Sequence, residues 1–179
     1  MRKQQKGFSL IELLIVVAII LIIAAIAIPN LMRAKMAANT SSAAASERSI
    51  VTGEIAYFAA FPTLGYPAAM VTLGGAPGVA CVPSSTTACL IDSNLANDGT
   101  PPNSGKSGYN FIETGANNGV GAPILNDFYT TAAAQSVNTG TTAFCAVDDG
   151  VVRSEPATTI ATTVVADYPT CQGLNPLTN

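Results

Sequence analysis

The sequence predicts an α+β protein in which one long amino-terminal helix packs on a small antiparallel β-sheet. The 16 residues from Leu13 to Ile28 are all Leu, Ile, Val or Ala, a run typical of a helix that crosses a bilayer. Residues 30–60 are rich in helix formers. After residue 107, short aromatic or β-branched runs alternate with turn residues, as in antiparallel strands. A chain of 179 residues accommodates one such domain plus an appended element.

Three of the eight basic residues, Arg2, Lys3 and Lys6, precede the apolar run. Positive charge on this side of a membrane span favours a cytoplasmic amino terminus, so everything after Pro29 is expected outside the cytoplasm. Without these three charges the formal net charge changes from −3 to −6. An acidic remainder without a Lys/Arg cluster argues against nucleic acid as a partner.

Glu12 is the one charged residue between Phe8 and Ile28. A carboxylate inside an apolar span costs about 2.5–3.5 kcal/mol on insertion scales. No Lys or Arg lies within reach on its apolar side, so its partner is expected to come from outside the helix. Two alternatives stay open, namely an interfacial Glu that reaches toward lipid headgroups and an ordinary secretory signal cleaved near residues 24–27.

The run KGFSLIELLIVVAII, from Lys6 to Ile20, resembles the prepilin amino terminus that type IV pilins share with type II secretion pseudopilins. The resemblance extends to Pro29, where such proteins usually carry a proline. It implies that a prepilin peptidase cuts between Gly7 and Phe8 and methylates the amine of Phe8. It also implies an assembly role for Glu12, whose carboxylate would meet the amine of a neighbouring subunit.

The expected organisation is a leader peptide (1–7), a transmembrane and polymerisation helix (8–29), an amphipathic continuation (30–61) and a globular head (62–179). Pro29 is expected to kink or locally melt the helix, because it lacks a backbone donor and crowds the preceding turn. In the continuation, four apolar residues recur at helical spacing and are expected to face the head: Ile50, Val51, Ile55 and Phe58.

The head is expected to begin with a Pro/Gly/Ser/Thr-rich loop over residues 62–106. A small antiparallel sheet is expected over residues 107–155, with strands at 109–112, 127–131 and 143–147. Asp149 and Gly150 are expected to form a two-residue hairpin that leads into Val151–Arg153. Residues 158–165 suggest one more edge strand. Such a head is similar to that of pilin-like proteins.

The four cysteines, Cys81, Cys89, Cys145 and Cys171, lack the two-residue spacing of zinc sites, and their even number beyond an export signal predicts disulfides. Three pairings are possible. The shorter loops favour Cys81 with Cys89 and Cys145 with Cys171. The loop 145–171 resembles the disulfide-closed terminal loop of many pilins.

The chain has no histidine, the commonest general base and metal ligand. Gly105-Lys106-Ser107 fails as a phosphate-binding loop, because the first glycine of that pattern would fall on Thr100. A loose calcium site, of the kind that some pseudopilins carry, would draw on four aspartates: Asp92, Asp98, Asp148 and Asp149. Solvated turn residues are the favoured interpretation of all four. We therefore expect that the protein is not an enzyme and that it binds no cofactor and no metal.

The expected function is that of a structural subunit of a type IV pilus-like filament. Its expected partners are prepilin peptidase, identical or homologous pilin subunits and an inner-membrane assembly platform. The expected location is the bacterial inner membrane with the head in the periplasm, then the pilus or a periplasmic filament. A type II secretion pseudopilin is the alternative, and a membrane-anchored periplasmic enzyme or binding protein is the least favoured hypothesis.

Overall fold

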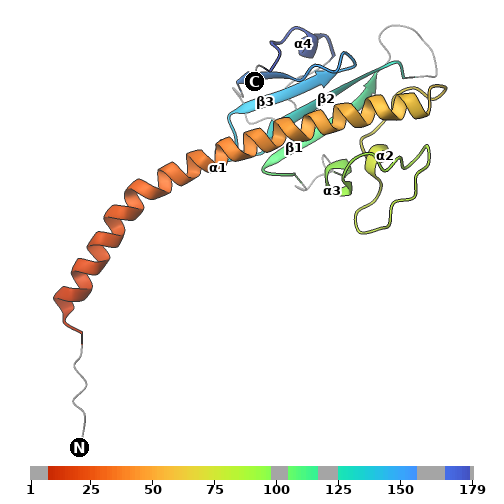
Figure 1. Ribbon diagram of the computed structural model, residues 1–179. Helices are drawn as coiled ribbons and strands as arrows, with labels where there is room; N and C mark the ends of the chain where they lie inside the picture. Colours follow the sequence, from red (N-terminus) through yellow and green to blue (C-terminus); the bar gives the residue numbers. More distant parts are fainter. Residues whose placement is uncertain (1–7, 98–104, 117–124, 157–167, 178–179) are drawn as a thin grey trace, which may run out of the picture. The chain divides into compact units, whose positions relative to one another are not determined.

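A computed structural model describes residues 8–97, 105–116, 125–156 and 168–177 of the chain (Figure 1). The elements in chain order are α1 (Leu10–Ala60), α2 (Val71–Gly74), α3 (Ser93–Ala96), β1 (Tyr109–Ala116), β2 (Asp127–Ala134), β3 (Thr142–Val147), β4 (Arg153–Pro156) and α4 (Tyr168–Gln172). The chain divides into two units, with the boundary between Lys35 and Met36 inside α1. The second unit contains the sheet, the short helices and the second half of α1, and it is called the head below.

The four strands form one antiparallel sheet in the order β1-β2-β3-β4. β1 and β2 pair along their full length, from Tyr109 opposite Ala134 to Ala116 opposite Asp127. Shorter antiparallel ladders join β2 to β3 and β3 to β4. Figure 1 shows the second half of α1 lying across one face of this sheet. The predicted α+β class, a long helix packed on a small antiparallel sheet, is confirmed.

The face of the sheet toward α1 carries the main hydrophobic core. Because side chains alternate between the two faces of a strand, every second residue of β1, β2 and β3 faces the helix. These residues include Tyr109, Phe111, Phe128, Ala132, Phe144 and Ala146, which cluster with Ala43, Ile50, Val51 and Tyr57 of α1. Burying each large apolar side chain contributes about 1.5–3 kcal/mol. This layer belongs to the larger of the two hydrophobic clusters among the described residues.

The face of α1 that packs on the sheet differs in part from the expected one. Ile50 and Val51 are buried, whereas Ile55 is 47% exposed and Phe58 is 36% exposed. The buried stripe instead follows the spacing of three and four residues that one helix face requires. It runs through Ala43, Glu47, Ile50, Glu54 and Tyr57. The stripe was missed because two of its members are glutamates, which a count of apolar residues leaves out.

The described residues 61–97 after α1 contain two short helices, where a long loop was expected over residues 62–106. Its helices α2 and α3 insert Leu73 and Leu95, which are 0% and 1% exposed, into the head. A Cβ atom added at Gly53 of α1 would lie 2.9 Å from the Ile91 side chain. The missing side chain at Gly53 thus permits close approach of this segment to α1. Cys81 and Cys89 form a disulfide within it.

The opposite face of the sheet carries a smaller core under the carboxyl-terminal segment. Cys145 of β3 is bonded to Cys171 of α4, and both pack with Val147. Helix α4 was not expected from the sequence. The edge strand expected at residues 158–165 lies outside the described residues. The last described residues border β4, since the Ser154 amide donates to the Asn175 carbonyl over 3.2 Å.

The connection between β3 and β4 is longer than the expected two-residue hairpin. Five residues, 148–152, separate the strands, and β4 begins at Arg153. The Asp149 carboxylate explains the difference because it accepts hydrogen bonds from the Val151 amide over 2.9 Å and from both terminal nitrogens of Arg153 over 3.1 and 2.5 Å. These bonds fold Val151 into the turn. The Arg153 guanidinium also lowers the pKa of Asp149.

Two isoleucines of α1 test which face of the helix packs on the sheet. Ile50→Ala should lower the free energy of unfolding by about 2–5 kcal/mol, the usual cost of emptying a buried aliphatic site. Ile55→Ala changes the same side chain on the exposed face and should cost well under about 1 kcal/mol. Urea denaturation of both variants in detergent micelles measures the difference. Equal losses would contradict the packing described for α1.

Candidate assembly segment

Helix α1 begins at a capped amino terminus. Ser9 precedes the helix, and the Leu13 amide donates to its carbonyl over 3.3 Å. The Ser9 amide in turn donates to Glu12 Oε2 over 2.9 Å. A Glu three residues after the cap that reaches back to the cap amide is half of a capping box. Glu12 therefore holds the first turn of α1.

This contact changes the interpretation of Glu12. The sequence suggested that the helix itself offers the carboxylate no partner, because only Lys and Arg side chains were considered. The backbone amide of Ser9 is such a partner, and an acidic side chain in the first turn also complements the helix dipole. The Ser9–Glu12 spacing was the signal that could have revealed it.

The first half of α1 is apolar all round. From Phe8 to Leu31, the large apolar side chains are 47–85% exposed. The helix is long and apolar enough to cross a membrane by length and composition. A helix with apolar side chains on every side is stable only where lipid or other helices cover it. Residues 8–31 thus form a surface that requires an apolar environment.

Pro29 lies inside α1, which continues on both sides of it. The sequence suggested a kink or local melting at Pro29. The helix does not melt there. The Asn30 side-chain amide donates to the Ile26 carbonyl over 3.1 Å, which gives this turn a hydrogen bond close to the donor that proline lacks. A kink at Pro29 stays a prediction.

Most of the other predicted site residues belong to the head. Gly7 is outside the described residues, as is Asp98. The Asp149 carboxylate accepts hydrogen bonds from the Arg153 guanidinium. Asp148 accepts a short hydrogen bond from the Tyr168 hydroxyl. Among the described residues, no group of three or more His, Cys, Asp or Glu side chains is arranged to hold a metal ion.

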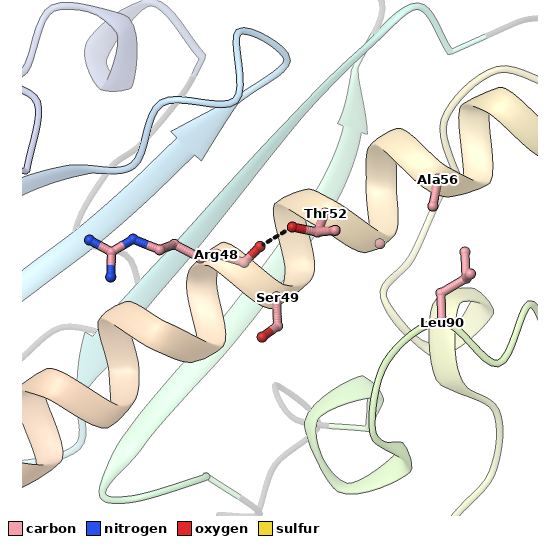
Figure 2. Close-up of a pocket in the computed structure, with 6 residues that line it drawn as sticks. Arg48, Ser49, Thr52, Ala56 and Leu90 are labelled. Atoms are coloured by element: carbon pink, nitrogen blue, oxygen red, sulfur yellow. Dashed lines mark hydrogen bonds between the residues drawn. The ribbon is translucent and has the colours of Figure 1, made fainter.

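A shallow groove of about 410 Å³ lies on the head beside the outer side of α1. It is lined by Arg48, Ser49, Thr52, Gly53, Ala56 and Leu90 (Figure 2). The Thr52 and Ser49 hydroxyls donate to carbonyls of their own helix, over 2.8 and 3.1 Å. Figure 2 shows the Arg48 guanidinium directed away from Thr52 and Leu90. The groove therefore offers mainly small and apolar contact surface.

Three buried glutamates were missed by the sequence analysis: Glu47 and Glu54 of α1 and Glu113 of β1. Burial raises the pKa of Glu47 from its ordinary value of 4.5 to about 8. Burial also raises the pKa of the other two, and repulsion by Glu113 raises that of Glu54 further. The available signals were the seven-residue spacing of Glu47 and Glu54 and the alternation of Glu113 with Phe111 and Tyr109.

Comparison with known proteins finds matches to the amino-terminal segment. Residues 2–28 match the family described as the prokaryotic N-terminal methylation motif. Over 37 residues the chain is 62% identical to the type IV wide pilus major component PilA4 of Thermus thermophilus. That match covers 21% of this chain and 28% of the length of PilA4. No solved structure gives a significant match.

The cap at Ser9 predicts different effects for two substitutions of Glu12. Glu12→Ala removes the acceptor and should speed hydrogen exchange of the Ser9 amide about two- to fivefold, since a lost cap costs about 0.5–1 kcal/mol. Glu12→Gln keeps an acceptor oxygen and should have a smaller effect. NMR of the full chain in micelles measures both. Unchanged exchange in Glu12→Ala would refute the cap.

Proposed function

We propose that this chain, whose prepilin-type amino terminus and pilin relative support the type IV pilin family, is a structural subunit of a type IV pilus-like filament. The exposed apolar surface of residues 8–31 carries the proposal. Lipid covers this surface before assembly, and the helices of neighbouring subunits cover it afterwards. Packing between such helices depends on close side-chain contact, which an apolar rod provides along its length.

Processing by prepilin peptidase is the first step of the proposal. The enzyme cuts the bond between Gly7 and Phe8, and the Phe8 amine is methylated. Phe8 lies just before the capped first turn of α1 and is 85% exposed, which suits an end that an enzyme must reach. The apolar helix stays behind as the membrane anchor.

Glu12 then acts in assembly. The new amine of Phe8 lies four residues from Glu12 along the chain, and a carboxylate in an apolar layer is stabilised by a cation. One oxygen of Glu12 holds the Ser9 amide, while the charge of the carboxylate attracts the amine of an adjoining subunit. A charge pair inside an apolar interface penalises other registers, so it selects one axial position for each added subunit.

The head supplies the outer surface of the proposed filament. An inner-membrane assembly platform adds subunits from a pool anchored by residues 8–29, with the heads in the periplasm. The two disulfides, Cys81–Cys89 and Cys145–Cys171, suit an oxidising compartment outside the cytoplasm. The proposed work of the protein is mechanical, and the pilin family is a structural family rather than an enzyme family.

A type II secretion pseudopilin is the second candidate. The prepilin motif is common to both classes, so the match over residues 2–28 favours neither. The disulfide-closed carboxyl-terminal segment and the low charge of the head support the pilus subunit. The relative named above is a pilus component, which supports the same choice for this chain.

Mass spectrometry of filaments sheared from the surface of the native host tests the proposal. The expected result is this chain, beginning with N-methylated Phe8, in the filament fraction. A strain without the gene should lose these filaments and still secrete its exoenzymes. Loss of secretion with filaments intact would support the pseudopilin, and a mature terminus within residues 24–27 would contradict prepilin processing.

A further inference from the structure

The three buried glutamates lie together where α1 crosses the sheet. Glu47 and Glu54 are each 0% exposed and lie two turns apart in the buried stripe of the helix. Glu113, on β1, is 7% exposed. All three side chains therefore lie in the layer between α1 and the sheet, among the largest apolar side chains of the head.

The strand register places Glu113 beside Thr130, the residue that is bonded to Glu47. Glu113 of β1 is directly opposite Thr130 of β2, and residues paired in this way lie side by side on the same face of a sheet. The Thr130 hydroxyl donates a short hydrogen bond to Glu47 Oε1. Thr130 thus neighbours Glu113 within the sheet and Glu47 on α1, and the charge of Glu113 acts on Glu54.

Most oxygens of these three carboxyl groups lack a hydrogen-bond partner in the described part of the chain. Apart from Glu47 Oε1, all their oxygens are buried and accept no hydrogen bond from the described residues. A buried carboxylate without partners is strongly disfavoured, whereas a neutral carboxylic acid costs far less. The geometry of this layer therefore favours the protonated groups.

The titratable groups around the cluster add to this preference. Glu54 lies near Glu113 of β1 and Tyr57 of α1. Its negative charge also contributes to the raised pKa of Tyr66, in the segment that follows α1. Tyr66 in turn interacts with Asp127 and Asp148. All of these groups carry negative charge when they ionise. Arg48, the basic neighbour of Glu47 on α1, is exposed.

We propose that Glu47, Glu54 and Glu113 form a pH-sensitive latch between α1 and the sheet. With the three acids neutral, residues 43–57 stay packed on β1 and β2. When the acids ionise, the layer must hydrate, and this part of α1 separates from the sheet. The latch concerns the attachment of helix to head and does not depend on which filament the chain forms.

The direction of the pH effect follows from the raised pKa values. Groups that bind protons more tightly in the folded state stabilise it fully below their unfolded pKa, near 4.5 for Glu47. That stability is lost as the pH rises through the folded pKa, about 8 for Glu47. Between these limits each group raises the equilibrium constant for opening by up to about tenfold per pH unit. Asp149, whose pKa is lowered, acts in the opposite direction at acidic pH, outside this window.

Hydrogen exchange of the full chain in detergent micelles tests the latch at pH 6 and pH 9. Protection factors, which divide out the pH dependence of intrinsic exchange, should fall at least tenfold over residues 43–57 at the higher pH. The variant Glu54→Gln with Glu113→Gln keeps the shape of both side chains without the charge. It should lose much less protection than the parent at pH 9, because Glu47 is then the one member of the cluster that still ionises. Glu155→Gln, on β4 with a partly exposed side chain, is the matched control and should behave as the parent.

A titration of the unmodified protein covers the case in which the double variant does not fold. Carbon-13 NMR of the five glutamate carboxyls should reveal that Glu47, Glu54 and Glu113 ionise above about pH 7. Equal protection of residues 43–57 at both pH values would overturn the latch. So would an equal loss of protection in the double variant, or ionisation of all glutamates below about pH 6.

Discussion

The structure depends on one constraint, which is that the two halves of α1 require different surroundings. From Leu10 to Leu31, α1 exposes large apolar side chains on all sides, and no arrangement within residues 8–35 can cover them. From Ala43 to Tyr57 the same helix buries one stripe against the sheet. Hydrophobic burial stabilises the second segment within the chain, whereas the first needs lipid or other helices. The proposed membrane anchor and the proposed filament both follow from this division.

In the head, the layer between α1 and the sheet contains both stabilising contacts and destabilising buried carboxyl groups. Tyr109 connects the sheet to α1. Its hydroxyl donates to the Thr142 carbonyl over 2.9 Å and lies 3.1 Å from the hydroxyl of Thr40 on α1. Glu47, Glu54 and Glu113 place carboxyl groups in the same layer, where an aliphatic side chain would be more stable. A head selected for stability alone would not need them, so their burial favours a role in controlling how α1 is held.

Much of the fold could be predicted because its signals are local. The apolar run from Leu13 to Ile28 indicates a helix wherever it stands, and the structure has the cysteine pairing that the shorter loops favour. The buried face of α1 was predicted only in part, at Ile50 and Val51, because Glu54 is buried only where the sheet covers it. The turn before β4 was misjudged for a similar reason, because Asp149 bonds to Arg153 instead of starting a tight hairpin.

Removing residues 1–35 tests most directly the claim that α1 serves two environments. The chain from Met36 onward keeps the buried stripe and both disulfides while losing the exposed apolar surface. It is expected to stay in solution without detergent and to unfold in one cooperative transition, whereas the full chain partitions into membranes. Sedimentation and thermal unfolding by circular dichroism measure both properties. A truncated chain that aggregates or lacks a cooperative transition would contradict the account, as would a full chain that stays in detergent-free solution.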